Sequence, residues 1–83
     1  MNENELRKIL GRKVREIRKK TKLTQQQLAE KIGVYQTDLS AFESRGEKIG
    51  MEKISAIFEC LGFEVKIGYD VQVSEKKTAL LSW

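Results

Sequence analysis

The sequence predicts an all-α bundle of four to five helices followed by one short β-strand. Apolar residues recur at spacings of three and four from Leu6 to Leu61, which is the period of helices with one buried face. The pattern changes to strict alternation between Phe63 and Tyr69, which is typical of a strand. The chain has 83 residues, which is long enough for a single domain with a modest core. It contains no proline, which suits a compact helical protein.

The first helix is predicted to run from Asn4 to Lys20. Its apolar face consists of Leu6, Ile9, Leu10, Val14 and Ile17. Basic residues occupy most of the remaining surface of this helix. Gly11 interrupts the pattern at a cost of about 1 kcal/mol relative to alanine, so a start nearer Ile9 is the alternative.

A capping box predicts the start of the second helix, because Thr24 precedes Gln27 by three residues. Its buried face is predicted to be Leu28, Ala29 and Ile32, and Gly33 is predicted to end it in a left-handed conformation. The third helix is predicted from Gln36 to Glu43. It should turn Leu39 and Phe42 inward and leave Gln36, Thr37, Ser40 and Ala41 facing outward.

A polar loop from Ser44 to Lys48 is predicted to lead into a fourth helix from Met51 to Leu61, with Gly62 as its C-cap. A lone strand after this helix would leave its backbone groups unsatisfied. No second strand is predicted, so the strand should pair with the same strand of a second chain. The predicted dimerisation residues are Phe63, Val65, Ile67 and Tyr69. Residues 1–69 would then form the domain, and residues 70–83 a flexible tail.

Positive charge is concentrated in the first part of the chain, whose overall net charge is +4. Residues 1–31 contain ten Lys/Arg and four Glu, a net charge of +6, whereas residues 32–83 have a net charge of −2. This asymmetry favours a basic surface that faces a polyanion. A solvated basic helix without any partner would produce the same pattern.

The residue types present argue against several classes of function. With one cysteine, Cys60, and no histidine, the chain has neither an internal disulfide nor a zinc site of the common cysteine or histidine type. Histidine-dependent nucleophilic catalysis is excluded as well. A carboxylate-based enzyme remains formally possible, but the acidic residues have the spacing of solvated helix faces. We therefore expect no enzymatic activity, no cofactor and no metal.

The sequence also carries no targeting signal that we recognise. No apolar run approaches the roughly 20 residues that span a bilayer, and the N-terminus has no secretory signal pattern. We expect a cytoplasmic protein without membrane association, located on the nucleoid if it binds DNA.

The segment from Thr24 to Glu43 resembles the Cro/C1-type (XRE-like) helix-turn-helix of phage and bacterial repressors. Ala29 is small at the point where the two helices cross, and Gly33 permits the sharp turn between them. The resemblance extends over residues 9–62. It implies a lambda-repressor-like bundle that binds double-stranded DNA.

The resemblance also implies which residues meet DNA. The helix that starts at Gln36 would lie in the major groove, where a glutamine can bond adenine in bidentate fashion. In this family a glutamine at the position of Gln25 bonds a phosphate beside the helix N-terminus. The predicted DNA-binding residues are Thr24, Gln25, Gln26, Tyr35, Gln36, Thr37, Ser40, Arg45 and Lys48. For Thr37 and Ser40 plain surface polarity is the alternative, and for Arg45 and Lys48 ordinary loop solubility.

Two further positions match a structural feature of the family. Arg18 and Glu43 occupy positions that form a partly buried ion pair between the first and third helices.

Three positions depart from the family pattern. Tyr35 replaces a short N-capping residue and cannot cap in that way, Asp38 complements the helix dipole but repels phosphates, and Lys22 stands where a turn glycine is common. The operator sequence therefore stays open.

The C-terminal region resembles a narrower group, the HipB-type antitoxins. In that group a strand after the fourth helix pairs across a dimer, and a C-terminal tryptophan docks into a HipA-type Ser/Thr kinase toxin. The matching residues are the strand from Phe63 to Tyr69 and Trp83, and the predicted toxin-binding residues are Leu80, Leu81 and Trp83. The alternative for Trp83 is packing back onto its own domain.

Three functions follow from these features. The first is an antitoxin that represses its own operon as a homodimer on a palindromic operator, with half-sites about 34 Å apart, and that binds a kinase toxin. The second is a stand-alone phage-type or host repressor without a toxin partner. The third is a protein–protein adaptor that has kept the fold and lost DNA binding.

Overall fold

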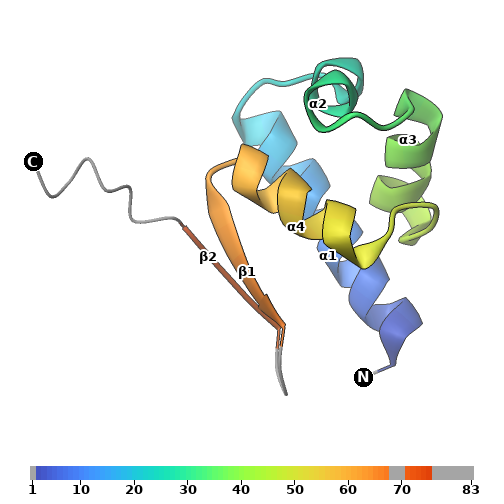
Figure 1. Cartoon of the computed structure of the whole chain (residues 1–83), viewed down its shortest axis with the longest axis vertical. Helices are drawn as coiled ribbons and strands as arrows, with labels where there is room; N and C mark the ends of the chain where they lie inside the picture. Colours follow the sequence, from blue (N-terminus) through green and yellow to red (C-terminus); the bar gives the residue numbers. More distant parts are fainter. Residues whose placement is uncertain (1, 68–70, 76–83) are drawn as a thin grey trace, which may run out of the picture.

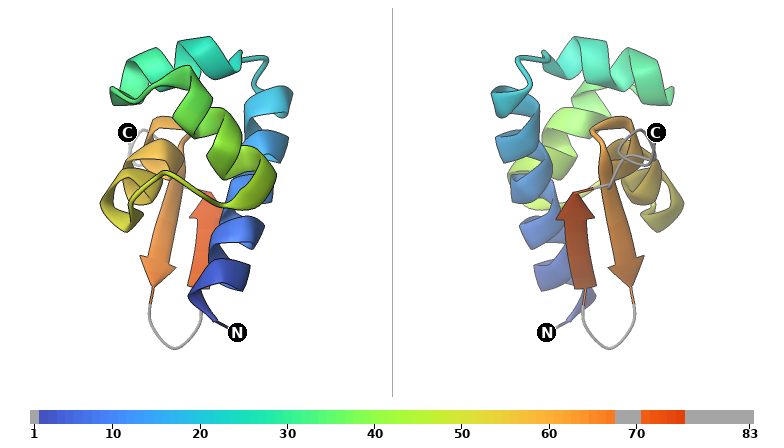
Figure 2. Two further views of the ribbon diagram at one scale, coloured as in Figure 1. Left: turned by 90° about the vertical axis from the view of Figure 1, so that its right-hand side faces the viewer. Right: turned by 90° about the vertical axis from the view of Figure 1, so that its left-hand side faces the viewer.

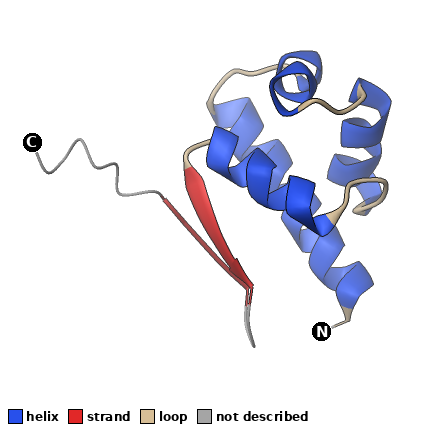
Figure 3. Cartoon of the chain, viewed as in Figure 1, coloured by secondary structure: helices blue, strands red, loops and turns tan. Residues whose placement is uncertain are grey.

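The computed structural model describes residues 2–67 and 71–75 and shows four helices followed by a β-hairpin (Figures 1 and 3). The elements in chain order are α1 (Glu3–Lys20), α2 (Gln25–Ile32), α3 (Gln36–Arg45), α4 (Met51–Cys60), β1 (Phe63–Ile67) and β2 (Val71–Glu75). The helical bundle expected from the sequence is therefore confirmed.

The first helix is continuous and starts slightly earlier than predicted. Asn2 caps it, because its side-chain oxygen accepts a hydrogen bond from the backbone N–H of Glu5 at 2.8 Å. Gly11 is buried inside the helix, and a Cβ at this position would overlap the carbonyl oxygen of Phe42. Glycine is thus required here so that the backbones of α1 and α3 can approach each other.

The second and third helices form the predicted helix-turn-helix. The capping box between Thr24 and Gln27 is present in both directions, and Gly33 ends α2 with a φ of 74°. The third helix extends two residues beyond the predicted end at Glu43 and stops at Gly46. Ala41 was predicted to face outward, but it is buried. Ala41 lies beside Phe42 on the side of α3 that faces the body of the protein.

The core lies between the helices and receives residues from all four. Its members are Leu10, Val14, Ile17, Leu28, Ala29, Leu39, Phe42, Ile49, Ile54, Ile57, Phe58 and Leu61. Apart from Ile49, which follows the polar loop, these residues were expected to face inward or lie on apolar helix faces. The fourth helix ends at Cys60, one residue before the predicted end, and Gly62 follows with a φ of 87°.

The C-terminal strand has a partner in its own chain, so the prediction of a single strand that must pair with a second chain was wrong. β1 and β2 are antiparallel, with Val65 opposite Val73 and Phe63 opposite Glu75. Part of the predicted flexible tail, residues 71–75, is this second strand. The reason is that a nearby strand can satisfy the backbone groups of β1 without a second molecule.

The hairpin covers one side of the bundle. Figure 2 shows β1 next to α4 and β2 next to α1. Phe63, Val65 and Val73 are partly buried and pack against the core, so their side chains are engaged within the chain. Of the remaining predicted residues, Tyr69, Leu80, Leu81 and Trp83 lie outside the described residues.

Candidate nucleic-acid interface

The start of α2 and the start of α3 meet at one open hollow on the surface. It is lined by Arg18, Lys19, Lys22, Leu23, Thr24, Gln25, Gln26 and Gln36. Four of the predicted DNA-binding residues, Thr24, Gln25, Gln26 and Gln36, are therefore brought together although they come from two helices. Lys19 and Lys22 border the same hollow and were not among the predicted residues.

One edge of α3 is polar and faces away from the body of the protein. Leu39 and Phe42 are fully buried on its inner side, and this burial fixes the rotation of the helix about its axis. Gln36 and Thr37 are exposed and Ser40 is half-buried. Within the described residues, none of these three polar side chains hydrogen-bonds to the protein, so they remain available for an external partner.

A buried carboxylate joins the first three helices. Glu43, only 2% exposed, accepts hydrogen bonds from Arg18 Nε at 2.8 Å and Arg18 Nη2 at 3.0 Å. The expected ion pair is thus confirmed, and Arg18 also donates to the carbonyl of Leu23 at 2.8 Å. Bidentate pairing of this kind is among the stronger charge-assisted interactions.

The same carboxylate also holds Gln25, which the sequence did not predict. Gln25 Nε2 donates to Glu43 Oε1 at 3.1 Å. An amide NH₂ group has two donors, so the second N–H of Gln25 remains available at the N-terminus of α2. The carboxylate of Glu43 on α3 therefore fixes the position of the Gln25 side-chain amide relative to that helix.

Two more of the predicted DNA-binding residues lie at the opposite end of α3. Arg45 and Lys48 border a second hollow, together with Asn4, Arg7, Lys8, Gly46 and Glu47. Arg45 forms an exposed ion pair with Glu47 at 3.0 Å. Lys48 adopts a left-handed φ of 75° in the loop. Six of the nine predicted DNA-binding residues thus fall into two groups, one at each end of the exposed edge of α3, and Thr37 and Ser40 lie on the edge itself.

Arg7 anchors this second region, a role that was not predicted. Its Nε donates to the carbonyl of Gly46 at 2.8 Å, and its Nη2 donates to the carbonyl of Ile49. The signal in the sequence is its position four residues before Gly11, on the same side of α1. Arg7 therefore connects the first helix to the loop that follows α3.

A comparison with known protein families agrees with this geometry. A family model described as a helix-turn-helix domain matches residues 11–66. The chain belongs to the helix-turn-helix domain family. The match supports the Cro/C1-type (XRE-like) resemblance, and helix-turn-helix proteins of this type are DNA-binding regulators. No curated protein and no solved structure matches the chain.

One position of this helix-turn-helix differs visibly from the usual arrangement. Tyr35 is the N-cap residue of α3 but makes no side-chain capping bond, as its residue type led us to expect. The residue is 78% exposed. A large aromatic side chain therefore stands in solvent between the two helices of the motif, directly before Gln36.

The described residues offer neither a metal site nor a membrane-spanning helix. Within residues 2–67 and 71–75, no group of His, Cys, Asp and Glu side chains is arranged to hold a metal ion. None of the four helices is long and apolar enough to cross a lipid bilayer.

Proposed function

We propose that this helix-turn-helix protein is a sequence-specific transcriptional repressor that binds duplex DNA as a homodimer. The observation that carries the proposal is the unpartnered polar edge of α3, which Leu39 and Phe42 hold outward from the core. An α-helix fits the major groove of B-DNA. In that position Gln36 can bond adenine N6 and N7, and Thr37 can reach neighbouring groups.

Phosphate contacts would place α3 in the groove. The second N–H of Gln25 and the free amides at the start of α2 can donate to one phosphate. Arg45 and Lys48, at the other end of α3, can contact the same backbone further along. Such contacts position the protein without reading sequence, and a protein that works in this way would act on the nucleoid in the cytoplasm.

Sequence reading by Gln36 can be tested directly. Duplexes would be selected from a randomised library by the full-length protein, and affinities would be compared with a scrambled duplex at fixed salt. We expect Gln36→Ala to lose affinity for the selected duplex by roughly 5- to 150-fold, because a bidentate base contact is worth about 1–3 kcal/mol. Affinity for the scrambled duplex should not change.

The matched control is Gln72→Ala in β2, which makes the same chemical change far along the chain from the motif. If Gln36→Ala binds both duplexes as the wild type does, base reading by this helix is refuted. If the wild type itself shows no preference for any duplex over the scrambled one, an adaptor that binds proteins through the same fold is the better assignment.

The homodimer is proposed because one chain presents a single recognition helix. Within the described chain the sheet has only the strands β1 and β2, so the outer edge of each carries unpaired backbone groups. Such an edge is a template for a strand of a second copy. Pairing would use the backbone, since the side chains of Phe63 and Val65 pack on their own core.

Light scattering tests the homodimer. Across micromolar concentrations it should give the mass of a dimer. A protein that is a monomer in free solution and also on DNA with two half-sites would contradict the proposal.

A HipB-type antitoxin is the second candidate. Its support is the apolar group of Leu80, Leu81 and Trp83 after a polar segment, because tryptophan is a strong interface anchor. The partner would be a HipA-type kinase encoded beside this gene. We expect the two proteins to copurify and Trp83→Ala to abolish the complex while DNA binding is unchanged. If no complex forms, the stand-alone repressor is the correct reading.

A further inference from the structure

Five basic residues follow one side of α1 and its C-terminal turn. They are Lys8, Arg12, Arg15, Lys19 and Lys22, at spacings of four, three, four and three residues. All five are exposed. We call this row the α1 basic track. Eleven residues separate Lys8 from Lys19, so the helical part of the track is about 16 Å long at a rise of about 1.5 Å per residue.

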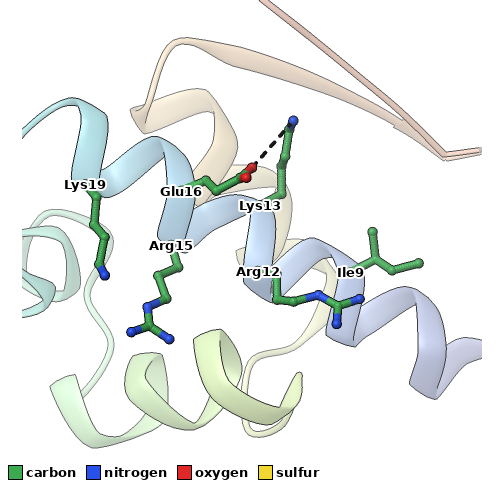
Figure 4. Close-up of a pocket in the computed structure, with 6 residues that line it drawn as sticks. All are labelled: Ile9, Arg12, Lys13, Arg15, Glu16 and Lys19. Carbon is green, nitrogen blue, oxygen red and sulfur yellow. Dashed lines mark ion pairs between the residues drawn. The ribbon is translucent and has the colours of Figure 1, made fainter.

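The track lies on the side of α1 that faces α3. Figure 4 shows Arg12, Arg15 and Lys19 on this side of the helix, whereas Lys13 points the opposite way. Lys13 and Glu16 form an ion pair at 3.8 Å. The acidic residue nearest the middle of the track is therefore paired with a cation outside it.

The track connects the two ends of the candidate interface. Lys19 borders both the hollow along α1 and the hollow that contains Gln25 and Gln36. At the other end, Lys8 borders the hollow that contains Arg45 and Lys48. One basic surface thus runs beside α3 along its whole length.

The charges of the track are not neutralised by the protein. None of its five residues forms an ion pair with another described residue. Like charges at spacings of three and four residues repel one another on a helix and destabilise it. A row of this kind is relieved when a polyanion supplies the opposite charge. Each strand of B-DNA carries a regular row of phosphates, so a row of cations about 16 Å long can face several successive negative charges.

We propose that the α1 basic track binds the phosphate backbone that borders the groove entered by α3. The inference rests on the proposed DNA binding and adds a second, sequence-independent contact surface to it. α3 reads bases, and the track supplies affinity that falls steeply with salt. The contact extends the footprint beyond the bases read by Gln36.

The test compares two variants that each remove two positive charges from α1. Arg12→Gln/Arg15→Gln alters the track, and Lys13→Gln/Lys20→Gln alters exposed positions away from it. Binding would be measured from 50 to 300 mM KCl on the selected duplex and on a random 30-bp duplex. For the track variant, the slope of log K against log salt should fall by about 1.8, since each phosphate contact contributes about 0.9. Affinity should drop by a similar factor, tenfold or more, on both duplexes. The control should stay within about twofold.

The possible results separate this inference from the proposed function. If the wild type binds no duplex, the proposed function fails and the inference fails with it. If the wild type binds but both variants lose affinity equally, only net charge matters and the track is refuted. If the track variant binds both duplexes with wild-type affinity and wild-type salt dependence, the track is refuted as well.

A measurement of thermal stability shows whether the track variant is still folded. Since the track residues are exposed and repel one another, the thermal midpoint of Arg12→Gln/Arg15→Gln should equal or exceed that of the wild type. If this variant unfolds, Lys8→Gln/Lys19→Gln applies the same criteria to the ends of the track.

Discussion

Individual residues decide how closely the first and third helices approach each other. Gly11 lies against the backbone of Phe42, and a Cβ on Gly46 would come within 2.6 Å of the backbone nitrogen of Lys8. Between these two contacts, Glu43 supplies a buried charge that Arg18 neutralises. The position of α3 and of its polar edge thus depends on two glycines, which have no side chain to keep the helices apart, and on one ion pair.

Replacement of Gly11 by alanine tests the first of these contacts. Alanine favours a helix by about 1 kcal/mol over glycine, but here its Cβ would overlap a backbone carbonyl. We expect a net destabilisation of about 1–3 kcal/mol from overpacking, measured by urea unfolding. Gly50→Ala, where the Cβ would meet nothing closer than 3.9 Å, should lose only the difference between glycine and alanine as the N-cap of α4, about 1 kcal/mol or less. A Gly11→Ala variant as stable as the wild type would show that the helices can separate without cost.

The ion pair is best tested with a double-mutant cycle. Glu43→Met leaves the charge of Arg18, whose side chain is only 11% exposed, without its partner. We expect a loss of about 3–5 kcal/mol for either single replacement by methionine. The double replacement should cost less than either single change, because no unpaired charge remains. Additive losses in urea unfolding would contradict this.

The helix ends show which elements are stabilised locally and which are not. The second helix has a complete capping box, whereas the third begins at Tyr35 without a side-chain cap. A Schellman-like end at Gly46 closes α3, with the glycine N–H bonded to the carbonyl of Phe42 at 2.8 Å. The position of α3 therefore depends on its buried side rather than on an N-terminal cap.

Tyr35→Ser should separate stability from binding. Serine at an N-cap position accepts a backbone hydrogen bond, so we expect a gain of about 0.5–2 kcal/mol in unfolding free energy. If the exposed ring contacts DNA, affinity for the selected duplex should fall at the same time. Tyr35→Phe, which keeps the ring and gains no cap, is the control and should leave stability unchanged. An affinity for Tyr35→Ser equal to that of the wild type would remove Tyr35 from the interface.

The described part of the chain is a helical core that a hairpin covers on one side, and its first helix carries eight of the 16 Lys and Arg residues of the sequence. The hairpin brings Val73 against the core. Because β1 and β2 are in one chain, their pairing requires no second molecule. The surface that α3 and α1 present on another side is thus independent of how the hairpin edge is used.

Neighbouring residues in β2 test this arrangement. Val73→Asp would place a carboxylate against the core, and we expect a loss of about 1–3 kcal/mol. Ser74→Asp, which adds the same group at an exposed position, should be nearly neutral. Thermal unfolding at several protein concentrations would show whether the difference is intramolecular. Equal behaviour of both variants would mean that residues 71–75 are a tail, as first expected from the sequence.

Local patterns in the sequence were enough to predict the helices, their buried faces and much of the motif. The capping box at Thr24 and the turn at Gly33 act between residues a few positions apart, so their effect can be read without knowing the fold. The polar edge of α3 follows from the same periodicity. The resemblance to known repressors added the pair of Arg18 and Glu43, which periodicity alone does not indicate.

Only the tertiary structure decided the remaining features. The contact of Arg7 with Gly46 joins residues 39 positions apart, and that of Gln25 with Glu43 joins residues 18 positions apart. Such contacts depend on how helices cross, and periodicity does not specify a crossing. The second strand has just two apolar residues, Val71 and Val73, so its sequence signal is weak, and pairing with β1 makes it a strand. The sequence determined which faces are buried, and the packing of those faces determined which distant residues meet.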